Sequence, residues 1–329
     1  MYGKYSVTLS DGKRFEVNSG ETILEAAIKS GIHLEYSCKD GRCGVCMTKL
    51  VSGKTYELLK KNFLSKKDKQ ENKILTCCSG LESDILIDAE DLFYLSDIVT
   101  KVLPCKIDSI NRLSKDVISV VLRLPPGSDF DYLAGQYISL FGPSGEKRSY
   151  SIASYNLKDK GKIELYIKLY EKGLFSEFFS NVAKVNDLMR LEGPLGTFFL
   201  RDHDVDNLIF LATGTGIAPI KGILESMKKN NLTKKFSQIL VYYGTRYKED
   251  IFFNYKDFVP SGVEFKLILS KLGKDIKYVQ DAVLADFKSL ENTCIYACGS
   301  SNMIQSAHDK FLEYNLDSKL FFSDSFLES

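Results

Sequence analysis

Four cysteines with a distinctive spacing constrain this chain more than any other feature. Cys38, Cys43 and Cys46 follow the pattern C-x4-C-x2-C, and Cys77 lies thirty residues further on. Four thiolates at this spacing can hold a 2Fe–2S cluster. A structural zinc site pairs its ligands as C-x2–4-C twice, and no second pair exists because Cys77 and Cys78 are adjacent. The C-x-H motifs of a Rieske centre are absent as well. The spacing therefore indicates a 2Fe–2S site.

The residues between the cysteines support the same interpretation. Gly41 and Gly44 have no Cβ and accept a positive φ, so the backbone can wrap around the sulfides and aim its amide groups at an anionic cluster. The alternative is that these are buried apolar cysteines. That reading requires three cysteines in a loop of Gly, Lys, Asp and Arg residues, and we favour the cluster.

Composition narrows the remaining function classes. The chain has 329 residues, which suggests about two domains by length, and 44% of them are hydrophobic. Its net charge of +1 argues against a generic binder of nucleic acid or anionic membranes. No apolar run approaches the ~20 residues of a membrane span, and no signal-peptide core opens the sequence. With eight cysteines and no secretion signal, disulfides are not expected, and we predict a cytoplasmic protein.

The first part of the chain reads as a compact unit. Residues 1–18 predict a hairpin around Asp11-Gly12, and residues 22–30 predict a helix that ends at Gly31. A strand over 45–53 and a closing strand over 85–90 follow the cysteine loop. The lysine-rich segment 60–73 also carries acidic residues and no aromatic platform, so we expect a solvated helix face rather than a binding patch.

The pattern changes between about Pro104 and Arg201. Short β-rich runs separated by Pro, Gly, Asn and Asp predict an antiparallel barrel or sandwich. The expected strands cover residues 105–110, 117–124, 137–142, 148–154, 162–170 and 188–193.

After Asp206, strands alternate with helices, which predicts a doubly wound parallel sheet. The strands are expected at 208–213, 238–244, 264–270 and 294–299, with helices at 217–229, 249–258 and 302–314. Three domains fit this organisation better than two: residues 1–95, 104–203 and 204–329.

Two segments of the barrel carry candidate binding residues. Arg148, Tyr150 and Ser151 follow a Gly/Pro turn and supply a cation for a diphosphate, an aromatic face and a hydroxyl. Gly173 and Ser176 lie at a turn before a helical run, where amides and a hydroxyl can bind phosphate.

A glycine-rich turn lies in the C-terminal part of the chain. Gly214, Thr215 and Gly216 join a buried strand to a helix, in the form G-T-G-I-A-P rather than G-x-G-x-x-G. Cys298 and Gly299 lie at the carboxyl end of a later strand, where doubly wound sheets bind ligands. Cys294 is expected in the core.

These motifs resemble known families. LEYSCKDGRCGVCM and ILTCC resemble the cluster loop of plant-type ferredoxin domains, which implies a β-grasp fold and gives the fourth ligand role to Cys77 rather than Cys78. R-x-Y-S, G-x-x-S and G-T-G-I-A-P resemble the ferredoxin–NADP reductase superfamily. That resemblance implies FAD binding by Arg148, Tyr150, Ser151, Gly173 and Ser176, pyridine-nucleotide binding by Gly214, Thr215 and Gly216, and a place beside the nicotinamide for Cys298-Gly299.

The C-terminal half also carries weaker resemblances. The segments Ser270-Lys271 and 277–280 faintly resemble the parts of the plant enzymes that bind the 2′-phosphate of NADP, but Lys271 replaces an arginine. Arg246, in Gly244-Thr245-Arg246, is common to both nucleotide classes. We therefore predict NADH, with NADPH possible. Phe326 covers the flavin ring or is an exposed tail aromatic.

The combination of the parts predicts an electron-transfer enzyme. A nicotinamide delivers two electrons as hydride, a flavin accepts the pair, and an iron–sulfur cluster passes single electrons on. The three histidines lie outside every motif, and nothing in the sequence suggests a hydrolase. We predict Ser151 and Cys298 as the catalytic residues.

The whole chain resembles the CDP-6-deoxy-delta-3,4-glucoseen reductase family, through segments such as PCKIDSI, EGPLGTFFLR and FFSDSF. The resemblance implies that the partner is a pyridoxamine-phosphate-dependent dehydrase of 3,6-dideoxyhexose synthesis. The alternatives are the reductase component of a bacterial mono- or dioxygenase, and a non-catalytic ferredoxin-like electron carrier.

Overall fold

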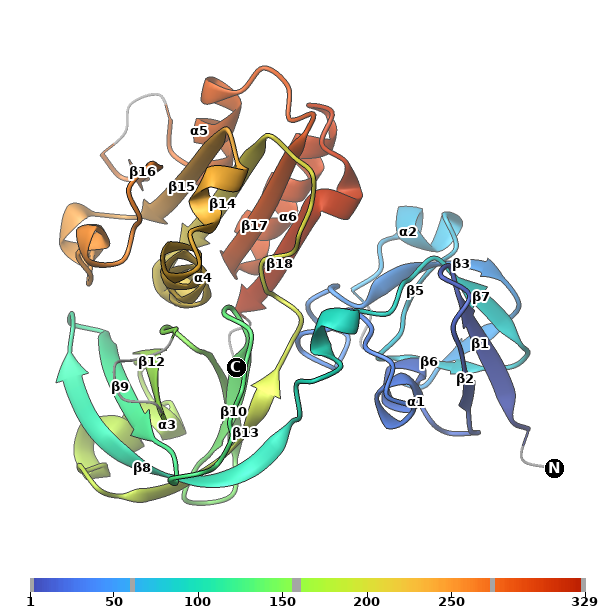
Figure 1. The fold of residues 1–329 in the computed structure, drawn as a ribbon, viewed down its shortest axis with the longest axis horizontal. Helices are drawn as coiled ribbons and strands as arrows, with labels where there is room; N and C mark the ends of the chain where they lie inside the picture. The colour runs from blue at the N-terminus through green and yellow to red at the C-terminus, as the bar shows by residue number, and fades with distance from the viewer. Residues whose placement is uncertain (1–2, 60–62, 156–160, 273–275, 327–329) are drawn as a thin grey trace. The chain divides into compact units, whose positions relative to one another are not determined.

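The computed structural model describes residues 3–59, 63–155, 161–272 and 276–326. The chain forms two compact units, residues 1–99 and residues 100–328, which are drawn in Figure 1.

The first unit is built on a five-stranded mixed sheet in the order β2-β1-β7-β3-β5, with β4 and β6 as a separate pair. β1 pairs parallel with β7, and the other neighbours are antiparallel. Its elements are β1 (Tyr5–Leu9), β2 (Arg14–Val17), α1 (Ile23–Lys29), β3 (Met47–Ser52), β4 (Thr55–Glu57), α2 (Lys66–Gln70), β5 (Lys73–Leu75), β6 (Ser79–Leu81) and β7 (Ile85–Ile87).

The predicted hairpin and helix of this unit are confirmed. Gly12 has a φ of 85° in the turn between β1 and β2. Thr22 and Glu25 form a capping box at the start of α1. Gly31, with a φ of 71°, ends the helix in a Schellman motif, since its N–H bonds Ile28 O and the next N–H bonds Ala27 O.

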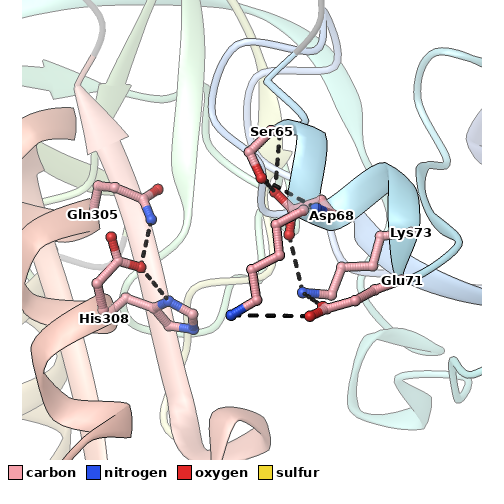
Figure 2. Close-up of polar contacts among 8 residues, drawn as sticks. Ser65, Asp68, Glu71, Lys73, Gln305 and His308 are labelled. Carbon is pink, nitrogen blue, oxygen red and sulfur yellow. Dashed lines mark hydrogen bonds and ion pairs between the residues drawn. The ribbon is translucent and has the colours of Figure 1, made fainter.

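The lysine-rich segment also forms the solvated helix expected of it, although residues 60–62 lie outside the described residues. α2 has no buried residue, and Ser65 caps it with a capping box to Asp68. Figure 2 shows Lys73 reaching both Asp68, at 3.0 Å, and Glu71, at 2.9 Å. These partly exposed ion pairs balance the charges within the segment.

The second unit begins with a six-stranded antiparallel sheet in the order β11-β10-β13-β8-β9-β12. The sheet closes into a barrel where Ile152 bridges Leu165, which decides between the predicted barrel and sandwich. Its elements are β8 (Lys101–Arg112), β9 (Val117–Arg123), β10 (Tyr137–Phe141), β11 (Lys147–Ser151), β12 (Lys162–Lys168), α3 (Leu174–Glu177), the π-helical turn η2 (Phe178–Val182) and β13 (Leu188–Leu195).

A five-stranded, all-parallel sheet follows in the order β16-β15-β14-β17-β18, as predicted. Figure 1 shows α4 between this sheet and the barrel, and the side chains of α5 and α6 share a core with the opposite face. The elements are β14 (Asn207–Thr213), α4 (Ile217–Lys229), β15 (Gln238–Thr245), β16 (Val263–Leu269), α5 (Val279–Asp286), β17 (Thr293–Ser300), α6 (Ser301–Leu312) and β18 (Phe321–Phe326).

The prediction of a helix over 249–258 is wrong. That segment contains only the 3-10 turns η5 (Lys248–Asp250) and η6 (Tyr255–Asp257). Asp250 accepts a hydrogen bond from Tyr247 N–H and Asn254 accepts one from Lys256 N–H. Such local side-chain bonds compete with helix formation.

On α6, Gln305 and His308 both contact Asp309, at 2.8 and 3.6 Å, so His308 has a local partner (Figure 2). Among the described residues, no helix is long and apolar enough to cross a bilayer.

Candidate functional site: a thiol loop and two cofactor motifs

The predicted cluster ligands lie together in the first unit. Cys38, Cys43 and Cys46 occupy the loop between α1 and β3, and Cys77 follows β5. The sulfur atoms of Cys46 and Cys77 lie 3.1 Å apart, and Cys38 and Cys43 form a second hydrogen-bonded pair. All eight cysteines of the chain are thiols rather than disulfides.

This pairing fits a two-iron cluster. A mononuclear tetrahedral site needs four converging ligands, whereas a 2Fe–2S cluster held by four thiolates needs two at each iron. Two separate pairs of thiols are therefore the arrangement that the cluster requires.

The backbone of the loop also suits thiolate ligands. Gly41 and Gly44 have φ values of 76° and 79°, which confirms the expected need for glycine. The Cys38 N–H donates to Cys43 Sγ at 3.5 Å. A second hydrogen bond joins the two side chains, and together with the amides of Asp40 and Arg42 it lowers the pKa of the Cys38 thiol to about 7. The same side-chain bond raises the pKa of Cys43, which keeps the shared proton.

The two adjacent cysteines, Cys77 and Cys78, have different neighbours. Cys77 contacts Cys46, whereas Cys78 Sγ lies 3.5 Å from Cys77 Sγ and has no contact of that kind with Cys46. Burial raises the pKa of Cys78 to about 12, and the hydrogen bond with Cys46 raises the pKa of Cys77 as well, so only the contact with Cys46 separates the two thiols. The Thr76 hydroxyl beside them is buried without a hydrogen-bond partner.

In the second unit, the R-x-Y-S motif forms β11. Strand alternation places Arg148 and Tyr150 on one face and Ser151 on the other. Arg148 is partly exposed, and burial raises the pKa of the Tyr150 hydroxyl. The Tyr150 ring lies 6.0 Å from the Phe175 ring, so the G-x-x-S turn that contains Phe175 packs beside this strand.

The turn itself precedes a helical run, as expected. Gly173 precedes α3, which has only four residues and continues into the π-helical turn η2. Ser176 is buried, and its hydroxyl accepts a hydrogen bond from Tyr170 N–H at 2.8 Å. The Ser176 hydroxyl therefore stabilises the turn as an acceptor, and it could contact a phosphate oxygen only by donating its own hydrogen. A phosphate contact by Ser176 stays a prediction.

The glycine loop Gly214–Gly216 lies at the carboxyl end of β14, the first strand of the parallel sheet. The chain runs to β15 on one side of β14 and later to β17 on the other, so this is the switch point of the sheet. A Cβ at Gly216 would lie 2.3 Å from Cys298 O, and one at Gly299 would lie 2.2 Å from Thr213 Oγ1. The side of Gly214, where φ is 54°, is open. The backbone is therefore tightly packed at Gly216 and Gly299, whereas space is left beside Gly214. A dinucleotide bound at this loop needs such space.

The two predicted catalytic residues, Ser151 and Cys298, both neighbour Asp324. Cys298 is fully buried and pairs in register with Ala212 on one side and Asp324 on the other. The Ser151 hydroxyl donates to Asp324 Oδ2 at 3.4 Å. Burial, and then Asp324, raises the pKa of Cys298 well above its ordinary range.

Asp324 was not predicted as a site residue. Its signal was an acidic residue in the apolar run FFSDSF, which forms β18. Phe326 ends that strand half-buried against the core between the barrel and the sheet.

The residues considered for nucleotide choice lie on the β15–β16 side of the sheet. Backbone hydrogen bonds from Ser270 to Thr245 and from Lys271 to Arg246 hold the two segments together. The side chains of Arg246 and Lys271 are exposed, as is Tyr278. Gln280 instead points between helices and bonds Ser306 Oγ at 3.1 Å, so it is not available to a nucleotide.

Comparisons with known proteins agree with these parts. Residues 7–82 match the family described as the 2Fe-2S iron-sulfur cluster binding domain, residues 104–200 the oxidoreductase FAD-binding domain, and residues 210–261 the oxidoreductase NAD-binding domain. The predicted cofactors and fold class are confirmed. The chain is an oxidoreductase whose three domains form an electron-transfer chain to an electron-accepting enzyme. The alternative of a non-catalytic, ferredoxin-like electron carrier, which has no flavin, would explain only the match over residues 7–82.

Relatives extend over nearly the whole chain. Terephthalate 1,2-dioxygenase reductase component 1 from Comamonas sp is 29% identical, covering 96% of this chain and 95% of its own. The crystal structure of Amycolatopsis cytochrome P450 reductase GcoB has a TM-score of 0.73 at 23% identity and covers 98% of both chains, which shows a common fold. The CDP-6-deoxy-L-threo-D-glycero-4-hexulose-3-dehydrase reductase of Yersinia pestis is 39% identical over 325 residues, 96% of each chain. The chain therefore belongs to the family of CDP-6-deoxy-L-threo-D-glycero-4-hexulose-3-dehydrase reductases.

Proposed function

We propose that this protein transfers electrons from NADH to a pyridoxamine-phosphate-dependent CDP-sugar dehydrase. The observation that carries the proposal is 39% identity across 96% of both chains to a reductase named for that dehydrase. When bound, the nicotinamide supplies a hydride, the flavin accepts it, and the cluster passes single electrons outward. We also propose the cytoplasm as its location, where thiols stay reduced.

We assign the roles of the chain's residues by domain. Residues 1–95 hold the cluster, residues 104–203 hold FAD and residues 204–329 hold the nicotinamide nucleotide. Cys38, Cys43, Cys46 and Cys77 are the proposed ligands, supported by the two close thiol pairs. Arg148 binds the FAD diphosphate, Tyr150 packs on the flavin, and Gly173 and Ser176 lie at its phosphates. Gly214, Thr215, Gly216 and Arg246 bind the nucleotide, and Gly299 allows its loop to close on Thr213.

Ser151, Asp324 and Cys298 are the proposed groups at the point of hydride transfer. Asp324 accepts the Ser151 hydroxyl proton in a hydrogen bond and so fixes the orientation of that side chain. Cys298 has a neutral thiol, because burial raises its pKa. The position therefore combines a neutral thiol with the buried carboxylate of Asp324, which holds the Ser151 hydroxyl.

The proposal is tested by reconstitution with its acceptor. We expect the purified protein, NADH and the CDP-sugar dehydrase with its bound glucoseen adduct to form the 3-deoxy ketosugar. The matched control is Cys77→Ala, which should still reduce ferricyanide with NADH but should fail to support the dehydrase. Failure of the native protein to form the ketosugar, while it supports an oxygenase, would overturn the assignment.

The second candidate is the reductase of an oxygenase, favoured by the relative that is 29% identical. Its test uses the same reductase preparation with a terephthalate-type dioxygenase. NADH oxidation coupled to product formation would support it, and NADH oxidation without hydroxylated product would exclude it.

We propose NADH over NADPH because Gln280 is turned away from the nucleotide edge and is bonded to Ser306. Arg246 and Lys271 are the exposed cations that a 2′-phosphate would use. We expect kcat/KM to be higher with NADH. A higher value with NADPH that disappears in Arg246→Ala would contradict this preference.

A further inference from the structure

A buried lysine joins the barrel to the nucleotide half of the second unit. Lys221 lies on the second turn of α4, and only 11% of its side chain is exposed. Its ammonium donates to Ala153 O at 2.7 Å and pairs with Glu164 at 3.1 Å and Glu225 at 2.7 Å. Ala153 and Glu164 belong to the barrel, and Glu225 belongs to α4.

The two carboxylates are themselves held in place. Glu164 Oε1 accepts the Ser119 hydroxyl at 2.7 Å, and Glu225 Oε2 accepts the Tyr155 N–H at 2.8 Å. Removing charges from water is costly, and a buried network of this kind stabilises a fold weakly compared with apolar packing. What such a network does well is to fix one arrangement of its elements, because each donor and acceptor has a set partner.

The elements that it fixes carry the two cofactor motifs. Ala153 lies two residues after Ser151 at the end of the R-x-Y-S strand, and α4 begins directly after Gly216. The helix also approaches that strand end closely, since a Cβ at Gly222 would lie 3.1 Å from Ile152 O. Lys221 therefore connects the flavin motif to the helix that leaves the nucleotide loop.

We propose that Lys221 is a positioning residue for hydride transfer: it fixes α4, and with it the Gly214–Gly216 loop, against the end of the strand that carries Arg148, Tyr150 and Ser151. The inference rests on the flavin and nicotinamide sites proposed above. Hydride transfer is sensitive to placement, and an error of 1 Å can cost on the order of 100-fold in rate.

The test is Lys221→Met, which keeps the length of the side chain and removes its charge. The full-length holoprotein is mixed anaerobically with NADH, and the loss of flavin absorbance is followed without any acceptor. We expect the limiting rate to fall by roughly 10- to 100-fold while the NADH concentration for half-maximal rate changes by less than about threefold. Lys221→Arg should recover part of the rate, because it restores the donors.

Two further variants separate positioning from stability. Lys266→Met is the matched control: Lys266 also pairs with two carboxylates, Asp286 at 2.7 Å and Glu264 at 3.4 Å, but these lie within the nucleotide half. It should leave the limiting rate unchanged. The triple variant Lys221→Met, Glu164→Gln, Glu225→Gln leaves no unpaired charge, so it should fold and still transfer hydride slowly.

A triple variant with the native limiting rate would overturn the proposal, as would equal rate losses in Lys221→Met and Lys266→Met. The readout involves no dehydrase, so failure of the proposed acceptor would leave this result unaffected.

Discussion

The cluster loop and the nucleotide loop both depend on glycine and cysteine, but for different physical reasons. In the cluster loop, Gly41 and Gly44 adopt φ values of 76° and 79°, which side chains rarely tolerate. The nucleotide loop also contains one glycine with a positive φ, Gly214 at 54°, but its Gly216 has an ordinary φ of −60° and is required because a Cβ there would lie 2.3 Å from Cys298 O.

The cysteines differ in the same way. Cys38 and Cys43 share a proton in a loop surrounded by backbone amides, and the pKa of Cys38 is lowered. Cys298 is fully buried, and its pKa is raised. The cluster loop therefore lowers the pKa of one thiol, Cys38, through a neighbouring thiol and local amides, whereas the other region keeps a thiol neutral through tertiary packing.

The strongest prediction concerns the fourth ligand of the local site. Cys77→Ala removes the partner of Cys46 and should abolish cluster binding, with iron and acid-labile sulfide falling close to zero. Cys78→Ala should retain a full cluster, because Cys78 lies beyond Cys77 rather than beside Cys46. Iron and sulfide analysis, with the visible spectrum, measures both variants.

FAD content is the control for this pair, since neither cysteine belongs to the unit with the flavin motifs. The reverse pattern would make Cys78 the ligand. A full cluster in both variants would show that the two thiols substitute for each other.

The next prediction concerns the tertiary site. Gly216→Ala places a methyl group against the Cys298 carbonyl, and backbone on both sides limits relaxation. We expect a loss of about 1–3 kcal/mol in the free energy of unfolding. We also expect the NADH-dependent reduction of ferricyanide to fall by roughly 100-fold.

Gly262→Ala is the matched control. Gly262 has a φ of 86° with open space around it, so alanine there should cost about 1–2 kcal/mol through backbone strain alone. Its activity per folded molecule should stay native. Native activity in Gly216→Ala would show that the contact with Cys298 is not required.

The same contrast explains how far the sequence was informative. The cluster loop could be predicted almost residue by residue, because ligand spacing and glycine φ are properties of a continuous segment. The strands of the barrel and four of the five strands of the parallel sheet were also predicted, since their hydrophobic patterns are local, but β18 was not. Asp324 and Lys221 were missed because their partners, Ser151 and Glu164, lie far away in the chain. The helix expected at 249–258 failed because Asp250 and Asn254 bond nearby backbone instead.

The smallest predicted effect is a pH dependence from the packed thiols of the second unit. Burial raises the pKa of Cys105 and Cys294 to about 12, from 9.0 in an exposed thiol. Above pH 9 the unfolded chain loses these protons first, so it binds fewer protons than the folded chain and stability falls as pH rises. Between pH 9 and 10 each such thiol should lower the free energy of unfolding by about 1 kcal/mol.

Comparison with Cys105→Ala isolates the contribution of one thiol from tyrosine and lysine titrations. That variant should be less stable at pH 8, because it leaves a small cavity, yet its stability should fall less steeply to pH 10. Urea unfolding of the second unit at each pH measures the difference in slope. Equal slopes in the two proteins would mean that Cys105 titrates as an exposed thiol. The contrast between the lowered pKa of Cys38 and the raised pKa of the packed thiols would then be limited to Cys294 and Cys298.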